Sequence, residues 1–259
     1  MKRRYITLSK QTGWTSLSGK FKALLFNPGN KIRRMYMLNV LSNYMPRQAP
    51  LILEVGAGLG DFAYEFIHRY ANYIHYILLD IDRDAMMESM KSLKVFPCDW
   101  DFILADAQRL PFRSEIFDVV ICAEVLEHVS DDFSAMSEIK RVLRKKAIGI
   151  VSIPLHSRKD KGEVRTYNIN TFKNLVNDAG LSIDSILLCC RIINLINKIF
   201  KYLFKREGMG EKEAVLYSKI PIIPKIFTPP LMFFDSLLSK RQPQIQDEGT
   251  LIVCIRRYT

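Results

Sequence analysis

The segment LILEVGAGLGDF, residues 51–62, constrains the fold more than any other part of the sequence. Its apolar start predicts a buried strand over Leu51–Val55, and the three glycines that follow predict a turn whose backbone amides can approach a ligand closely. A nicotinamide-binding turn has the spacing G-x-G-x-x-G, but here Asp61 stands at the last position, where a carboxylate would repel a pyrophosphate. Glu54, just ahead of the turn, also suits an ammonium group better than two phosphates. The segment therefore predicts a zwitterionic ligand.

The rest of the chain alternates between predicted strands and predicted helices. An amphipathic helix is expected over Asn30–Tyr44, and a strand over Thr250–Ile255 follows a long stretch of different composition. Between them, the expected elements are helix Asp61–Tyr70, strand Ile74–Leu79, helix Asp84–Leu93, strand Asp101–Leu104, strand Phe117–Cys122, helix Asp131–Arg144, strand Ile148–Ile153, helix Thr171–Ala179 and strand Ile183–Cys190. This alternation predicts an α/β protein with a doubly wound sheet.

Five motifs occur in the order in which they follow one another in class I S-adenosylmethionine-dependent methyltransferases. They are EVGAGLGD, LLDID, ADAQRLPF, FDVVICAEVLEHV and IKRVLRKKAIGIVSIP, and they cover about Leu51–Pro154. The sequence resembles this family, in particular its type 11-like members. The resemblance implies a Rossmann-like sheet of seven strands with an antiparallel last strand, S-adenosyl-L-methionine as cofactor, and methyl transfer as the activity.

The resemblance also implies roles for residues at the carboxyl ends of the strands. Asp80 is expected to accept hydrogen bonds from both ribose hydroxyls, with a role as a helix N-cap or an exposed turn acid as the alternative. Asp106 is expected to accept the adenine amino proton, with a plain turn role as the alternative. The other expected cofactor-binding residues are Glu54, Gly56, Gly58 and Gly60 around the methionine and ribose, Ile81 and Ala107 beside the adenine, and Ala123 at the edge of the pocket.

The segment CAEVLEH after the fourth strand is expected on the acceptor side of the site. It lacks the N/D-P-P-Y/F signature typical of methylation of adenine or glutamine amino groups, which makes those acceptors less favoured. A helix here would place Glu124, Glu127 and His128 on one face, where they could remove a proton or hold a divalent cation. The spacing E-x-x-E-H resembles that of quinone-biosynthesis O-methyltransferases, in which such a cation is associated with it. A structural role in holding the loop is the main alternative, and no metal ligand is assigned.

Two segments outside the motifs are expected to lie over the site. The chain has a formal net charge of +11, and no acidic residue precedes Glu54, so residues 1–50 form a basic arm and helix for which a solvated charge run is the simplest interpretation. Residues 191–246 form an insertion in which lysines and asparagines occupy one side of a helical pattern and apolar residues such as Phe200 and Leu203 the other. A helical cap, contact with a membrane surface and contact with nucleic acid are the interpretations, in that order.

The sequence thus predicts a cofactor-binding core over residues 51–190, completed by the last strand within residues 247–259. The leading hypothesis is methyl transfer to a small or lipid-linked acceptor, including O-methylation at a membrane surface. An RNA methyltransferase and a non-catalytic cofactor-binding protein are the alternatives. His156, Arg165 and Tyr167 are expected near the substrate. The five cysteines show no metal-binding spacing and no apolar signal segment is seen, so a reduced, cytoplasmic protein, peripheral to the inner face of the membrane, is expected.

Overall fold

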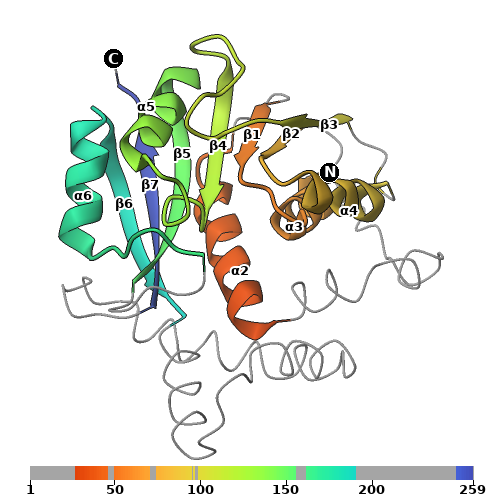
Figure 1. Cartoon of the computed structure of the whole chain (residues 1–259), viewed down its shortest axis with the longest axis horizontal. Helices are drawn as coiled ribbons and strands as arrows, with labels where there is room; N and C mark the ends of the chain where they lie inside the picture. The colour runs from red at the N-terminus through yellow and green to blue at the C-terminus, as the bar shows by residue number, and fades with distance from the viewer. Residues whose placement is uncertain are drawn as a thin grey trace, which may run out of the picture.

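The computed structural model describes residues 27–45, 50–70, 74–94, 96, 99–155, 162–190 and 249–258 (Figure 1). Three of the sequence predictions lie outside these residues: the basic arm up to residue 26, His156, and the insertion over residues 191–246. The described residues comprise the predicted cofactor-binding core and the helix that precedes it.

These residues form one sheet of seven strands in the order β3-β2-β1-β4-β5-β7-β6. β7 is antiparallel to both of its neighbours, and all other paired strands are parallel. The strands are β1 Leu51–Val55, β2 His75–Asp80, β3 Asp99–Leu104, β4 Phe117–Ala123, β5 Leu143–Leu155, β6 Ser182–Cys189 and β7 Gly249–Arg256. The order confirms the predicted Rossmann-like, doubly wound sheet with an antiparallel last strand (Figure 1).

Helices pack on both faces of the sheet. They are α2 Pro28–Ser42, α3 Asp61–Tyr70, α4 Arg83–Leu93, α5 Asp132–Val142 and α6 Ile169–Asp178. Residues of α2, α3 and α4 share one buried core with the sheet, whereas residues of α5 and α6 share a second. Successive residues of β1 show the division, because Ile52 belongs to the first core and Leu53 to the second. The domain therefore has three layers, with the sheet in the middle.

Short polar side chains explain where the helices begin. The side chain of Asn27 accepts a hydrogen bond from the Asn30 amide at the start of α2, at 3.1 Å. Asp82 and Asp131 cap α4 and α5 in the same way. Each cap supplies a partner for an amide that has none within its helix. The helices accordingly begin close to the predicted residues.

Glu124, Glu127 and His128 do not lie on one face of a helix. Glu124 has a left-handed backbone with φ of 56°, which bends the chain away from β4. A turn follows, in which the His128 amide donates to the Val125 carbonyl at 2.9 Å, and α5 begins only after it. The i, i+3, i+4 spacing of the three residues therefore does not describe one face of a helix.

The boundary between α5 and β5 also differs from the prediction. β5 begins at Leu143, directly after α5, instead of at Ile148. Leu143 pairs with Phe117, but Ile148 pairs with Val119, so β5 contains a bulge of extra residues opposite β4. The bulge carries Arg144, Lys145 and Lys146, and this charged run hides the strand from a search for apolar residues.

The N-terminal arm and the insertion connect to the described residues at the carboxyl edge of the sheet. β6 ends at Cys189, which pairs with Thr250 near the start of β7, so the insertion leaves and rejoins the sheet at this edge. The Cys190 thiol donates to the Gly29 carbonyl at 3.4 Å, which places the start of α2 there as well. α2 therefore begins at the carboxyl edge of the sheet.

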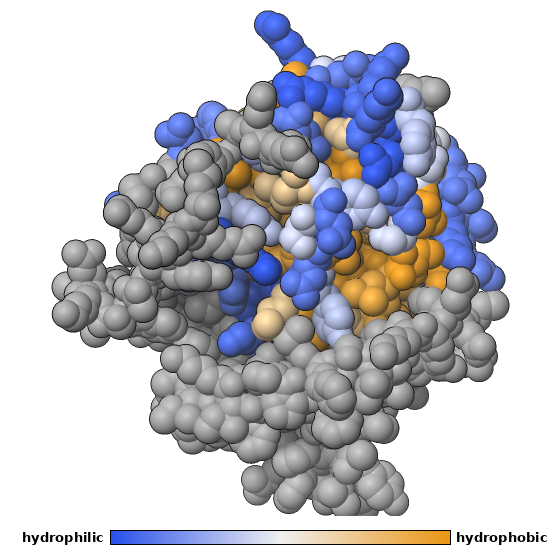
Figure 2. Space-filling model, turned by 180° about the vertical axis from the view of Figure 1, so that it is seen from behind, coloured by the Kyte–Doolittle hydropathy of each residue, from blue (hydrophilic) through white to orange (hydrophobic). Residues whose placement is uncertain are grey.

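Apolar side chains are exposed at the same edge. Ile81, directly after β2, is 70% exposed, and Leu104, the last residue of β3, is 58% exposed. Figure 2 shows a further hydrophobic area on the opposite side of the molecule from the view of Figure 1. No helix within the described ranges is long and apolar enough to cross a membrane.

Candidate cofactor and acceptor site

The glycine turn after β1 leaves one position open for a ligand. Gly56, Gly58 and Gly60 have φ values of 70°, 51° and 77°, which only glycine adopts easily. A Cβ at Gly56 would lie 2.2 Å from Val125, and one at Gly60 would lie 2.1 Å from the Ser89 hydroxyl, so these two glycines permit close packing. A Cβ at Gly58 would meet no atom of the described residues within 4 Å. Gly58 is therefore the position of the turn at which the described residues leave space for a ligand.

Asp80 fixes this turn and keeps the capacity to bind a ligand. Its Oδ2 accepts from the Gly58 amide at 2.6 Å, and its Oδ1 accepts from the Asp82 amide at 2.8 Å. The N-cap of α4 is Asp82, so the alternative that Asp80 merely caps that helix is wrong. A carboxylate has about four acceptor positions, and two of these are used. Both oxygens of Asp80 can still accept from a pair of hydroxyls.

The loop after β3 forms the other side of the predicted nucleoside pocket. Ala107 is buried, whereas Ile81 across the edge is exposed. Asp106 Oδ1 accepts from the Gln108 amide at 2.8 Å, and the Gln108 side-chain amide donates to both Asp106 oxygens at 3.0 Å. Asp106 is thus a turn residue in this structure, and its predicted contact with adenine stays a prediction.

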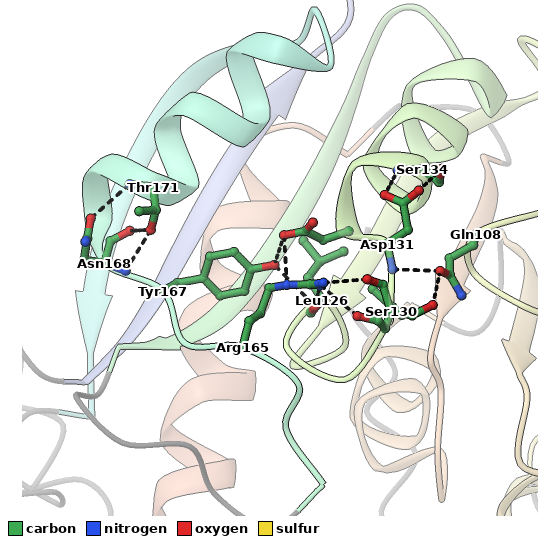
Figure 3. A network of polar contacts seen from close by, with 11 residues as sticks. Gln108, Leu126, Ser130, Asp131, Ser134, Arg165, Tyr167, Asn168 and Thr171 are labelled. Carbon is green, nitrogen blue, oxygen red and sulfur yellow. Dashed lines mark hydrogen bonds and ion pairs between the residues drawn. The ribbon is translucent and has the colours of Figure 1, made fainter.

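Gln108 connects this loop to the start of α5, a role that the sequence did not indicate. Its Oε1 accepts from the Ser130 hydroxyl and from the Asp131 amide, each at 2.8 Å. Figure 3 shows Gln108 reaching across to Asp131 and Ser130. The side chain thereby holds the Asp106 turn and the loop after β4 at a fixed separation.

Glu54 is buried beneath the glycine turn and is held as a neutral acid. Tyr76 donates its hydroxyl to Glu54 Oε2 at 2.7 Å, and burial raises the pKa of Tyr76 well above its ordinary value, so Tyr76 stays the donor. Burial raises the pKa of Glu54 to about 8, and the nearby Asp61 and Asp80 charges add to the effect. An ammonium group placed beside Glu54 would favour its charged form.

The acceptor side of the site contains an ion pair between α2 and the end of β4. Arg33 Nη1 lies 3.0 Å from Glu124 Oε2, and the two side chains are 17% and 23% exposed. Ala123, predicted at the edge of the pocket, is the last residue of β4 and lies beside Ser152 of β5. Nothing in the motif pattern indicated Arg33, because it lies in the helix ahead of the first motif.

Glu127 is a second buried acid. Its side chain is 2% exposed, and burial together with the neighbouring Glu124 charge raises its pKa to about 8. His128 Nδ1 lies 3.0 Å from the Gly162 carbonyl, to which it can only donate, and its Nε2 lies 3.9 Å from Glu127 Oε1. Across the described part of the chain, no group of three or more His, Cys, Asp or Glu side chains is placed to hold a metal ion. Nothing in this part of the chain supports the divalent cation.

Arg165 and Tyr167, predicted near the substrate, hold the loop after β4. Arg165 donates at 2.7–3.0 Å to three carbonyl oxygens of this loop, those of Leu126, Val129 and Ser130. The Tyr167 hydroxyl donates to Asp132 Oδ2 at 2.5 Å. Figure 3 shows both side chains pointing from the segment before α6 into this loop. Their contacts fix the segment that carries Glu127 and His128.

Two arginines of the basic N-terminal region are not part of a solvated charge run. Arg34 is 1% exposed, forms an ion pair with Asp61, and lies 3.7 Å from Glu65. Arg33 is paired with Glu124. The interpretation of the arm as a solvated run is therefore wrong for these two residues, which attach α2 to α3 and to β4.

These features fit a ligand with a ribose, an amino group and a flat ring. The space over Gly58, the two oxygens of Asp80, the exposed Ile81 and the buried Glu54 all lie at the ends of neighbouring strands. Ligands of open α/β sheets bind at this edge. The fold is Rossmann-like, and the predicted cofactor residues of β1 and β2 lie at its ligand-binding edge.

Comparison with known proteins shows which proteins the chain resembles. Residues 53–151 match the sequence model of the family described as a methyltransferase domain. The ubiquinone/menaquinone biosynthesis C-methyltransferase of Roseobacter denitrificans is 30% identical over 115 residues, which cover 44% of this chain and 46% of that protein. The chain spans about half the length of the curated relatives it matches.

Solved structures share the fold at low sequence identity. The cyclase SpnF has a TM-score of 0.59 at 15% identity, with 86% of this chain and 80% of that chain covered. Phosphoethanolamine N-methyltransferase 2 of Haemonchus contortus, in complex with S-adenosylhomocysteine, has a TM-score of 0.57 at 12% identity, with 87% and 53% covered. Residues 53–151 therefore resemble a methyltransferase domain, and the chain shares its fold with known methyltransferases.

The two buried acids predict how stability depends on pH. The folded protein keeps a proton on Glu54 up to about pH 8, whereas the ordinary pKa is 4.5. The stability that depends on neutral Glu54 is therefore complete below the ordinary pKa and is lost as the pH rises toward 8. In Glu54→Gln, urea unfolding between about pH 5 and 8 should show a slope of stability against pH that is flatter by up to about 1.4 kcal/mol per pH unit.

Glu127→Gln provides the matched comparison, because the pKa of Glu127 is also about 8. It should flatten the slope similarly, and the double variant should flatten it further. An unchanged slope in Glu54→Gln would show that Glu54 is not held neutral.

Proposed function

We propose that the protein transfers a methyl group from S-adenosyl-L-methionine to a small or lipid-linked acceptor at the carboxyl edge of its sheet. The observation that carries the proposal is the open space over Gly58 next to the two available oxygens of Asp80. The bound cofactor would supply a methyl group already activated by its sulfonium charge. The protein then needs mainly to align an acceptor atom and, for some acceptors, to remove a proton.

The proposed cofactor contacts follow the order of the strands. Asp80 would hold the ribose hydroxyls, and Glu54 would face the amino group of the methionine part. Gly56, Gly58 and Gly60 would let the backbone approach it. Ile81, Asp106, Ala107 and Ala123 would surround the adenine and the reacting end.

Glu124, Glu127 and His128 are proposed for the acceptor side. His128 can donate to the Gly162 carbonyl only through a protonated Nδ1, which leaves Nε2 of the neutral ring free to accept a proton. Glu127, with a pKa of about 8, also changes charge in the range where a proton acceptor is most effective. Glu124 is proposed to orient the acceptor, since its Oε2 is paired with Arg33.

The proposed acceptor is a small molecule. The curated relative from Roseobacter denitrificans is named for a quinone C-methylation, which supports this class and leaves carbon and oxygen as the candidate atoms. An RNA methyltransferase is the alternative that the net charge of +11 suggests. A non-catalytic cofactor-binding protein is the other alternative, because the cofactor motifs fit both an enzyme and a binding protein.

The proposed domain organisation follows the predicted boundaries. Residues 51–190 and 247–259 would form the core, whose described parts contain the whole sheet. Residues 1–50 and 191–246 would lie over the site. The attachment of both segments at the carboxyl edge supports this placement.

Replacement of Asp80 tests the function. Asp80→Ala should weaken binding of S-adenosylhomocysteine about 10- to 100-fold, because it removes a charged hydrogen-bond partner worth about 1.5–3 kcal/mol. It should also abolish transfer of labelled methyl groups to a component of a quinone and lipid extract. Calorimetry and the transfer assay measure the two effects.

Asp82→Ala is the matched control. It removes the N-cap of α4 at a cost of about 1 kcal/mol in stability but should leave the cofactor affinity unchanged. Equal affinity for S-adenosylhomocysteine in wild type and Asp80→Ala would contradict the ribose assignment. Transfer to RNA alone would favour the alternative acceptor.

Contact with the inner surface of a membrane is proposed for the segments at the carboxyl edge. The amphipathic sequence pattern of residues 191–246 and the lysines within it support this placement. Each lysine near an anionic bilayer contributes about 1 kcal/mol. The protein would then remain cytoplasmic and peripheral, close to a lipid-linked acceptor.

The protein should sediment with anionic liposomes and keep part of this binding in high salt, because apolar side chains persist where charges are screened. Replacing Phe200 and Leu203 by Ser should remove the salt-resistant part while the melting temperature stays close to that of wild type. No recovery above a liposome-free control, together with variants that only unfold, would contradict membrane contact and favour a cap.

A further inference from the structure

Arg33 brings a positive charge from α2 to the end of β4, where the acceptor is proposed to bind. Its Nη1 lies 3.0 Å from Glu124 Oε2. The charges of Arg33 and Glu124 both affect the pKa of Glu127, so the three side chains form one cluster. The cluster joins a helix that precedes all five motifs to the turn that follows β4.

This cluster contains buried polar atoms that lack hydrogen-bond partners among the described residues. They are Arg33 Nε, Glu124 Oε1 and Glu127 Oε2. Buried polar atoms in folded proteins are almost always paired, and an unpaired one costs about 1–3 kcal/mol. Glu124 also keeps its left-handed backbone at this point. Such strain and such unpaired atoms concentrate where a ligand is bound.

The attachment of α2 does not account for Arg33. α2 is already fixed by the ion pair between Arg34 and Asp61, by the Cys190 contact with Gly29, and by buried apolar residues such as Met37. A further ion pair that leaves one of its own N–H groups unpaired adds little to this packing. The geometry therefore favours a role toward a ligand.

The unpaired atoms comprise one N–H donor and two carboxyl oxygens. A hydroxyl group matches them, because it can accept from the arginine and donate to a carboxyl oxygen. An ammonium group can only donate, and the arginine would repel it. Val164, whose amide donates to the Glu127 carbonyl at 2.7 Å, is 44% exposed and provides an apolar surface beside the cluster.

We propose that Arg33 is a specificity-determining residue that selects a hydroxylated apolar acceptor. Its Nε–H donates a hydrogen bond to the hydroxyl oxygen. The hydroxyl in turn donates a hydrogen bond to a carboxyl oxygen of Glu124 or Glu127. This inference rests on the proposed methyltransferase function and names the chemical class of its acceptor. The inference applies to acceptors that are methylated on the hydroxyl oxygen or on a carbon next to the hydroxyl group.

A matched pair of probes tests the inference in protein saturated with S-adenosylhomocysteine. The probes are 2-naphthylmethanol and 2-naphthylmethylamine, which carries an ammonium group at neutral pH. Ligand-observed NMR titration should show saturable binding of the alcohol, at least about tenfold tighter than the amine. Arg33→Gln should weaken the alcohol about tenfold and leave the affinity for S-adenosylhomocysteine unchanged.

Two further variants separate recognition from charge and folding. Arg33→Lys keeps a positive charge for Glu124 but lacks the guanidinium N–H, so it should retain the wild-type melting temperature and still lose the preference for the alcohol. Arg144→Gln breaks an ion pair with Asp118 of 2.5 Å at the start of β5 and should bind both probes as wild type does.

Absent binding of the alcohol, equal or tighter binding of the amine, or a preference unchanged in Arg33→Gln and Arg33→Lys would each overturn the inference. Failure of the protein to bind S-adenosylhomocysteine at all would instead overturn the proposed function. The two failures are therefore distinguishable.

Discussion

The hydrogen bonds between the glycine turn and the end of β2 determine the geometry of the whole site. The amides of Gly56 and Ala57 donate to the Leu79 carbonyl at 2.8 and 3.0 Å, and the Gly58 amide donates to Asp80. These bonds fold the turn back over the neighbouring strand, where only left-handed glycines fit. They also direct the Asp80 carboxylate toward the space over Gly58. The same side chain thus shapes the turn and presents the proposed ribose contact.

Burial divides the charged residues of the site into two kinds. Glu54 and Glu127 are buried acids, and burial raises the pKa of each to about 8. Asp61 and Glu124 are instead paired with arginines of α2. The buried acids can respond to a ligand by changing protonation. The acids paired with arginines instead fix α2 over the sheet. The positive charge of the N-terminal region is consequently used, in part, inside the domain.

The sequence predicted β1 and β2 clearly, because both strands are largely apolar and are followed by the glycine turn or end at Asp80. The pattern from Leu51 through Asp80 places the strand, the turn and the candidate ribose ligand in the positions that the structure has. The residue pattern did not indicate the turn at Glu124, because residue spacing carries no signature of a left-handed residue after β4. The spacing i, i+3, i+4 fits a turn as well as a helix.

Contacts between distant segments also could not be predicted from the sequence. Arg33 lies 91 positions before Glu124, as the two residue numbers show, and no periodicity connects them. The sequence shows Gln108 only as a polar residue in the third motif. It does not indicate the contacts of Gln108 with Ser130 and Asp131, which lie in the loop after β4. Tyr76 looked like an ordinary strand residue, and only the fold brings it to Glu54.

The most direct measurement of the central claim is a crystal structure of the protein with S-adenosylhomocysteine. The account predicts that both ribose hydroxyls donate to Asp80, that the adenine lies between Ile81 and Ala107, and that the backbone at Gly58 contacts the ligand. It also predicts that the sulfur faces the turn that carries Glu124 and Glu127. A ligand bound elsewhere, or at this edge with its ribose away from Asp80, would contradict the account.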